Sequence, residues 1–305
     1  MIRTSRLAIA CALGSALAGT ACVDLVGADA RFVQREEKRF QVTGQPTVDL
    51  STFDGSIEIR PWDKAEVLVI VEKRAADKAD ADRIEVRADQ SGNRVSVEVR
   101  DPHDGSHFRF GWGRSAKLIV SVPAKTDLVA KSGDGSIDVE RIAGHLELRS
   151  GDGGIRGRDL EGDLRVHTGD GSIKIDGLNG ALDADTGDGS INAAGRLAAV
   201  RARSGDGSVT IHAAAGSAAS GDWDVVTGDG SVVVEVPDGF GAEVDAHAGS
   251  GSVRLQDVTL SNVSGRLSRN DVKGTLGSGG RSMRLRSGDG SITLRRGEGT
   301  AGNRE

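Results

Sequence analysis

The sequence contains no tyrosine, and its 3 tryptophans and 6 phenylalanines leave an aromatic content of 3%. Hydrophobic residues make up 37% of the 305 residues, which is little for a packed globule of this size. The 44 glycines lack the every-third-residue register of collagen, and they alternate with runs of valine, isoleucine and leucine. These features exclude a collagen helix, argue against a disordered chain and favour an ordered, turn-rich β protein.

Cysteine is also scarce, with only Cys11 and Cys22 in the chain. Arg3 and Arg6 precede a short apolar stretch at 7–18, which is typical of an export signal and too short to span a bilayer. Because Cys11 lies inside this stretch, the mature protein is predicted to have at most one cysteine and no internal disulfide. Its stability must then come from packing alone.

Two alternative cleavage positions are possible for the export signal. Removal of residues 1–21 would leave Cys22 first, in a context that resembles a bacterial lipoprotein box except that Gly19 replaces the usual aliphatic residue. Cys22 would then carry a lipid anchor to a membrane. Cleavage after Ala30 would instead release a soluble chain that begins at Arg31. Both alternatives predict an exported protein of the periplasm, outer membrane or cell surface.

Positive charge is not in excess, since the formal net charge is −6 and Lys/Arg are interleaved with Asp/Glu. A chain without a basic patch has few groups to neutralise phosphates. The composition therefore argues against a nucleic-acid partner.

A short motif recurs along the chain. SGDGSI at 132 is followed at intervals of 18 residues by SGDGGI, TGDGSI, TGDGSI and SGDGSV, and then by looser copies at 227, 248 and 287. Each repeat contains two segments of alternating apolar and polar residues, which are typical of half-buried strands. Neither strand pair can bury its apolar side alone. Stacked repeats can bury them together, with equivalent strands paired in parallel about 4.8 Å apart.

The predicted fold is therefore all-β: a parallel β-solenoid, similar to a β-helix or β-roll, with about 18 residues per coil. We assign the solenoid to 126–295, preceded by a β-rich N-terminal part at 31–125 and followed by a disordered tail at 296–305. One degenerate coil is expected between the motifs at 248 and 287. In the N-terminal part, strands are predicted at 40–42, 48–59, 66–72, 83–88, 94–100 and 117–122, with a hairpin turn at 90–93 and a helical or irregular connection at 75–82.

The repeated aspartates would form a ladder along one edge of the stack. The main interpretation is structural: the glycines would tolerate positive φ at a tight corner, and Asp, Ser and Thr would bond to nearby backbone. Calcium binding is an alternative, although the aspartate stands elsewhere in the calcium-binding nonapeptide repeats. The calcium candidates are Asp134, Asp152, Asp170, Asp188, Asp206 and Asp229. No metal or other cofactor is expected under the main interpretation.

Other chemistry is sparse. The alternating Phe108, Phe110 and Trp112 are candidates for contact with a sugar or peptide, or for sealing one end of the core. Scattered histidines are expected on the surface. A β-helical polysaccharide enzyme is a third hypothesis, but identical aspartates at repeated turns do not provide separate acid and base roles. The sequence therefore predicts no enzyme activity and no catalytic residue.

Three segments of the chain resemble the bacterial family labelled "putative adhesin", exported β-solenoid proteins of unknown function. These are FDGSIEIRPW at 53–62, LIVSVPAKTDLVAKSGDGSI at 118–137 and SGDGSITL at 287–294. The resemblance implies a non-catalytic envelope protein, adhesin-like or related to envelope stress, that serves as a binding or structural module. Its partner would be an envelope or cell-surface component, either protein or glycan.

Overall fold

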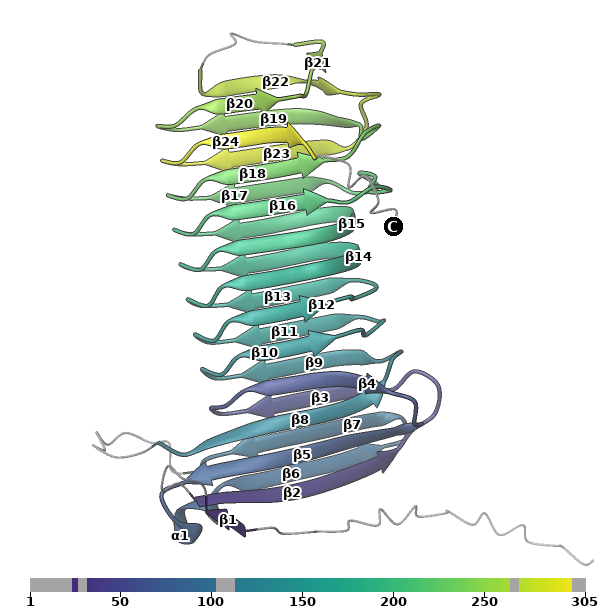
Figure 1. Cartoon of the computed structure of the whole chain (residues 1–305), viewed down its shortest axis with the longest axis vertical. Coiled ribbons are helices and arrows are strands. Elements are labelled where there is room, and N and C mark those ends of the chain that lie inside the picture. The colour runs from purple at the N-terminus through teal and green to yellow at the C-terminus, as the bar shows by residue number, and fades with distance from the viewer. Residues whose placement is uncertain (1–23, 27–31, 103–112, 264–268, 298–305) are drawn as a thin grey trace, which may run out of the picture.

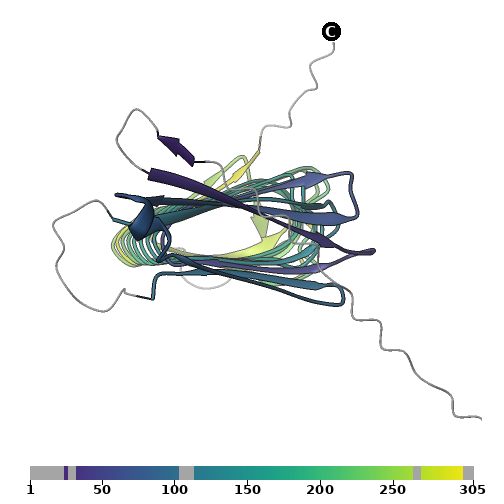
Figure 2. The ribbon, with the colours of Figure 1, turned by 90° about the horizontal axis from the view of Figure 1, so that it is seen from below.

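The strands cross the long axis of a rod and stack along it (Figure 1). The computed structural model describes residues 24–26, 32–102, 113–263 and 269–297. Viewed along the rod, two sheets face each other across a flattened interior (Figure 2). The protein is all-β and β-solenoid-like, so the all-β prediction is confirmed.

One sheet, the first face, contains the strands that follow the repeated motif, together with strands from the N-terminal part. In spatial order it contains β1 (Asp24–Val26), β2 (Phe32–Gln41), β5 (Glu66–Ala75), β8 (Ser115–Pro123), β4 (Ile57–Trp62), β10 (Ile137–Glu140), β12 (Ile155–Arg158), the starts of β14 (Ile173–Thr186) and β15 (Ile191–Ser204), β16 (Val209–Ala213), β18 (Val232–Val236), β24 (Ile292–Arg296) and β20 (Val253–Gln256).

The second face contains the strands that precede the motif, together with strands at both ends of the rod. It runs from β6 (Glu85–Ser91) through β7 (Arg94–Arg100), β3 (Thr47–Thr52), β9 (Asp127–Ser132), β11 (Leu146–Ser150), β13 (Leu164–Thr168), the ends of β14 and β15, β17 (Trp223–Thr227), β23 (Ser282–Ser287), β19 (Ala242–Ala248), β22 (Asp271–Leu276) and β21 (Leu260–Ser261). The helix α1 (Lys78–Ala81) joins β5 to β6.

The coils stack in register, so each inward position forms a column through the rod. On the first face Ile137, Ile155 and Ile173 are paired in parallel at intervals of 18 residues, and all three are fully buried. On the second face, Leu146 pairs with Leu164 in the same way. Alternate residues point outward, because successive strand side chains lie on opposite sides of a sheet. The core is therefore a narrow stack of aliphatic side chains enclosed by two outer surfaces.

Two coils lie out of sequence order. The first coil, β3–β4, sits between β7–β8 and β9–β10. The last coil, β23–β24, sits between β17–β18 and β19–β20, as the yellow strands in Figure 1 show. Neither coil forms an end of the rod. One end is formed by β1, β2 and β6, and the other by β20, β21 and β22.

Two predictions about these regions are wrong. The strand expected at 48–59 is two strands, β3 and β4, separated by a corner at 53–56. The expected degenerate coil between 248 and 287 is not a parallel coil, because β22 pairs antiparallel with β19. The β6–β7 hairpin around 90–93 is confirmed, as is a short helical turn within 75–82.

Left-handed backbone occurs at the corner opposite the repeated motif. Arg141 has φ 52°, Asp159 has φ 52° and the equivalent Gly177 has φ 78°. A left-handed residue with a Cβ costs about 1–2 kcal/mol, and aspartate tolerates the conformation better than arginine does. Arg141 is therefore the strained position of the three.

Replacing Arg141 by glycine is expected to stabilise the protein, by about 0.5–1 kcal/mol, because it removes this strain. The exposed Arg156 on β12, where no positive φ occurs, provides the control: Arg156→Gly should destabilise. Thermal melting of both variants checks the prediction. A lower Tm for Arg141→Gly than for the wild type would contradict it.

Candidate functional site

A hydroxyl group at the start of the motif connects neighbouring coils in every copy except the one at 248, which begins with Ala248. Ser150 Oγ donates to the carbonyl of Gly135 in the coil before it (2.9 Å) and accepts a hydrogen bond from the Gly153 amide (3.1 Å). The hydroxyls at the same position in other coils donate to the matching glycine carbonyl, and all are buried: Ser132, Thr168, Thr186, Ser204, Thr227 and Ser287. Here the Ser/Thr acts in the core of the corner and is not available for binding.

The glycines of the motif serve close approach between coils. A Cβ on Gly153 would lie 2.2 Å from the Gly135 carbonyl oxygen, and one on Gly189 would lie 2.1 Å from that of Gly171. The expectation of positive φ at these glycines is wrong, since Gly55 is the only one of these corner positions found there among the described residues. A side chain is excluded at these glycines because the backbones of neighbouring coils pack closely, and not because the glycines have positive φ.

The aspartates of the motif are all exposed, at Asp134, Asp152, Asp170, Asp188, Asp206, Asp229 and Asp289. They form a row of solvated carboxylates along the edge that we call the GDG edge. Within the described residues no group of three or more His, Cys, Asp or Glu side chains is arranged to hold a metal. Ser250, which replaces the aspartate in one coil, donates to Asp289 Oδ1 at 3.0 Å. The calcium hypothesis gains no support from this geometry.

Several sequence candidates lie outside the described residues. They are Cys22, the lipidation candidate, and the aromatic candidates Phe108, Phe110 and Trp112. These assignments stay predictions. No helix in the described part of the chain is long and apolar enough to cross a membrane.

The outer side of the second face carries charges of alternating sign. Asp183 Oδ2 lies 3.5 Å from Arg165 Nε on one side and 3.6 Å from Arg201 Nη1 on the other. Further along the stack, Arg203 Nη2 lies 2.6 Å from Asp224 Oδ2. Because these pairs join neighbouring strands, they favour one register of the coils. Sequence reasoning missed this pattern because the partners are separated by a whole repeat.

The described histidines at 145, 167, 212 and 247 follow the same arrangement. His145 Nδ1 lies 3.4 Å from Asp163 Oδ2, and His167 Nδ1 lies 3.3 Å from Asp185 Oδ1, in each case in the next coil of the stack. The side chains are 78% and 54% exposed, as the sequence predicted for surface positions. The neighbours of these histidines are therefore suited to ion pairing and not to binding a metal.

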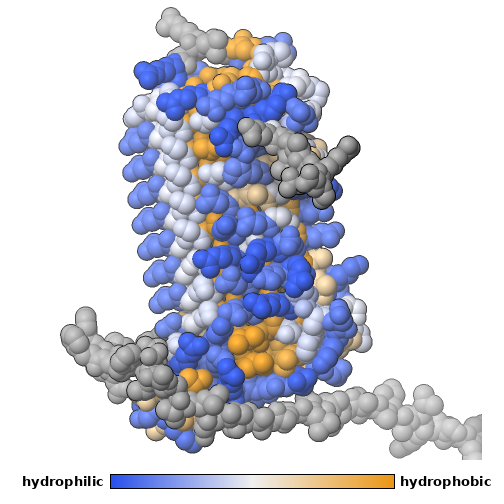
Figure 3. All heavy atoms as spheres, viewed as in Figure 1, coloured by the Kyte–Doolittle hydropathy of each residue, from blue (hydrophilic) through white to orange (hydrophobic). Residues whose placement is uncertain are grey.

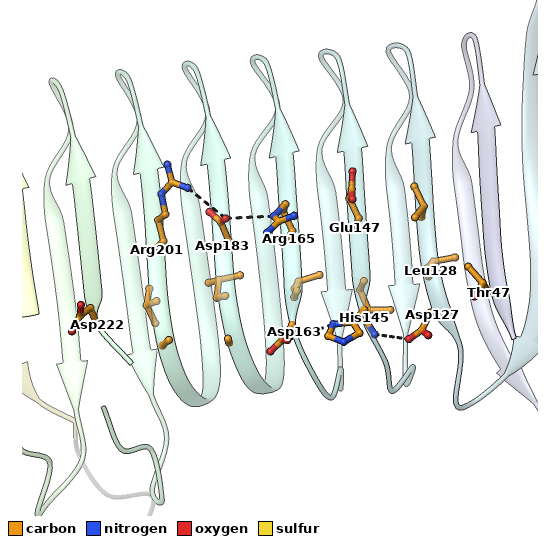
Figure 4. Close-up of a pocket in the computed structure, with 17 residues that line it drawn as sticks. Thr47, Asp127, Leu128, His145, Glu147, Asp163, Arg165, Asp183, Arg201 and Asp222 are labelled. Carbon is orange, nitrogen blue, oxygen red and sulfur yellow. Dashed lines mark hydrogen bonds and ion pairs between the residues drawn. The ribbon is translucent and has the colours of Figure 1, made fainter. Parts of the chain in front are cut away.

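A groove runs along the second face, across the five successive strands β9, β11, β13, β14 and β15 (Figure 4). Its volume is about 650 Å³. One rim contains Asp127, His145, Asp163, Ala181, Ala199 and Asp222, and the other contains Val129, Glu147, Arg165, Asp183 and Arg201. Apolar residues of the strands, such as Leu164 and Leu182, lie between the rims. Figure 3 shows the opposite, first face, where hydrophobic residues are visible between hydrophilic ones over the middle of the rod.

Two carboxyl groups next to the last coil have lowered pKa values. Burial raises the pKa of Glu235 on β18, but hydrogen bonds and charges of His212 and Arg295 outweigh this and place it below its usual range. Burial likewise raises the pKa of Asp245 on β19, and Arg286 (3.0 Å) and Lys273 (3.2 Å) outweigh it. Arg286 and Arg295 belong to the last coil, so both carboxylates hold that coil in place.

A pH dependence follows from these two groups. A carboxyl group with a lowered pKa stabilises the fold above its ordinary pKa, here 4.5 for Glu235 and 3.8 for Asp245, and this contribution is lost as the pH falls through the folded-state value. The variant Glu235→Gln/Asp245→Asn should be less stable than the wild type at pH 6, and the difference should shrink as the pH falls below 3.8. Urea unfolding midpoints check this. A stability difference that is independent of pH would contradict it, and exposed Asp188→Asn serves as the control.

The rod, its hydroxyl-linked corners and its charged outer faces define a β-solenoid-like repeat protein. The family model described as Toastrack DUF4097 matches residues 35–295, so the chain belongs to that family. The family resemblance predicted from the sequence is confirmed. A comparison with curated proteins found no match.

Among solved structures, the chain is similar to a putative adhesin from Bacteroides fragilis, with 14% identity and a TM-score of 0.41 over 86% of this chain and 96% of that one. It is also similar to a putative cell adhesion protein from Clostridium sporogenes, with 13% identity and a TM-score of 0.30 over 86% of this chain and 100% of that one. A putative adhesin from Parabacteroides merdae matches with 10% identity and a TM-score of 0.33, over 85% and 95%.

Proposed function

We propose that this protein is an exported, non-catalytic, adhesin-like rod that binds a protein or glycan component of the cell envelope or surface. The observation that carries the proposal is the second face, where outward side chains are held by ion pairs between coils beside a continuous groove. Side chains that are already positioned lose less conformational entropy when a partner binds. Such a surface suits binding or structural support.

The carboxylates support the non-catalytic part of the proposal. A general acid in polysaccharide cleavage needs a raised pKa, so that it is protonated at neutral pH. Among the described residues, the shifted carboxyl groups are Glu235 and Asp245, and cations lower the pKa of both. These two groups suit structural ion pairs.

Attachment through a lipid on Cys22 is also part of the proposal. The strand β1 begins two residues after Cys22 and pairs antiparallel with β2 at one end of the rod. Cleavage after Ala30 would remove β1, whereas cleavage before Cys22 would retain it. Fractionation of wild type beside Cys22→Ala tests this: the wild type should follow the membranes and the variant should be soluble. Identical partitioning would remove the anchor.

The binding function can be tested with beads that carry the purified protein and with intact cells or sacculi of the organism that encodes it. Attachment should differ from that of the wild type in the variant Arg165→Glu/Arg201→Glu, which reverses both arginine charges of the groove on the second face. The matched control Arg156→Glu/Lys174→Glu changes the charge equally on the first face and should attach like the wild type. Attachment no greater than that of bare beads would overturn the proposal, as would glycan cleavage that is lost when Asp152, Asp170 and Asp188 are replaced together.

A further inference from the structure

We propose that the groove on the second face binds an extended basic peptide segment that carries two cationic side chains four residues apart. This inference rests on the proposed function and names the chemistry of the partner. The segment would run along the rod, across the strands, and would be recognised by its side chains.

The charges on the groove select a cation. Its rims hold the carboxylates of Asp127, Glu147, Asp163, Asp183 and Asp222, against only two guanidinium groups, Arg165 and Arg201. Both of these arginines already pair with Asp183. Negative charge therefore remains on the groove after its internal pairs are formed. A cationic partner complements it.

Asp163 and Asp222 are the carboxylates best placed to meet that partner. Asp127 already accepts hydrogen bonds from Gln45 Nε2 (2.8 Å) and from the His145 amide (2.9 Å), and Glu147 pairs with Arg149 at 2.8 Å. Asp163 has one ion pair, with the exposed His145 at 3.4 Å. Asp222 accepts one hydrogen bond, from the Ser282 amide at 3.3 Å. Each of these two carboxylates keeps lone pairs that face solvent.

The separation of these two carboxylates fits an extended chain. Asp163 precedes β13 and Asp222 precedes β17, so three steps between neighbouring strands separate them, or about 14 Å. Four residues of extended peptide span nearly the same length, about 13.6 Å, and residues i and i+4 point the same way.

Small residues occupy the rim between the two carboxylates. Ala181 and Ala199 stand at the positions that Asp163 and Asp222 hold in the neighbouring coils, and their methyl groups leave the groove open there. In a bound peptide the side chain at i+2 would lie above these alanines. An apolar or β-branched side chain fits that place, because it removes apolar surface from water.

Binding of labelled peptides, measured by fluorescence anisotropy at low salt, tests the inference. The peptide Gly-Lys-Thr-Val-Thr-Lys-Gly places its lysines at i and i+4, and Gly-Lys-Thr-Val-Lys-Thr-Gly, of the same composition, places them on opposite sides. The wild type should bind the first peptide several-fold more tightly. Exposed ion pairs contribute about 0.2–1 kcal/mol each, so Asp163→Asn and Asp222→Asn should each weaken binding up to about fivefold.

Two further variants separate the groove from general electrostatics. Asp170→Asn on the GDG edge removes the same charge outside the groove and should bind like the wild type. Ala181→Phe fills the groove without a change in charge and should weaken binding of the first peptide. Equal binding of the two peptides, or an equal effect of Asp170→Asn and Asp163→Asn, would overturn the inference.

The same variants separate this inference from the proposed function. If beads attach to cells but attachment survives in Asp163→Asn/Asp222→Asn and in Ala181→Phe, the peptide site is wrong and the adhesive role stands. If the peptide binds as described but beads do not attach, the adhesive role is wrong and the peptide site stands.

Discussion

Replacement of Gly189 by alanine is expected to lower the free energy of unfolding by about 3 kcal/mol. The new Cβ would lie 2.1 Å from the Gly171 carbonyl oxygen, 2.5 Å from its carbon and 2.9 Å from the Ser172 amide nitrogen. All three atoms are backbone, and the backbone there is fixed by parallel pairing with the coils on both sides. A side chain could be accommodated only if the coils moved apart. Urea unfolding of the purified variant measures the loss.

The sequence provides a matched control directly after such a glycine. Gly154 stands where the other coils carry serine, and a Cβ there would meet one atom, the Ser172 oxygen, at 3.3 Å. Gly154→Ser is therefore expected to change stability by less than about 1 kcal/mol. If Gly189→Ala were as mild as Gly154→Ser, contact between coils would not explain the glycine.

This difference shows what the sequence could predict at the corner. A recurring Gly-Asp-Gly with alternating flanks predicts a repeated turn and inward positions such as Ile137 and Val139, both of which are buried. It does not reveal why glycine is required, because positive φ and close approach leave the same sequence pattern. Only the stacked coils place the Gly135 carbonyl where a Cβ of Gly153 would be.

The groove could not be predicted from the sequence, for a similar reason. Its rims combine residues one repeat apart, and its opening depends on Ala181 and Ala199, which are unremarkable in sequence. The insertion before Trp223 also hides the equivalence of Asp222 and Ala199, which becomes clear when Val200 pairs with Trp223. The regular spacing of the motif predicted the stack of coils. The chemistry of the groove depends instead on positions that depart from the repeat, such as Ala181, Ala199 and the insertion before Trp223.

Deletion of the last coil, which lies out of sequence order, is expected to have the largest effect on stability. Removal of residues 277–305 deletes the last coil and with it Met283, Leu285, Ile292 and Leu294, all fully buried. Burial of four such side chains contributes about 6–12 kcal/mol. The strands on either side cannot simply close the gap, since Arg284 separates Asp224 from Asp245 and direct contact would place the two carboxylates opposite each other. Like charges directly opposite each other across strands are destabilising.

The truncated chain is therefore expected to keep its central coils and to lose the structure of 242–276, because each coil contacts only its neighbours. Hydrogen exchange should show protection retained at 146–204 and lost at 242–276. A chain that ends at Gly297 keeps every described strand and serves as the control. Asp245→Lys in the truncated chain would place a cation opposite Asp224, so partial recovery of protection at 242–248 is expected. Full protection of 242–276 without this substitution would show that the last coil is dispensable and that charge does not determine the order of the coils.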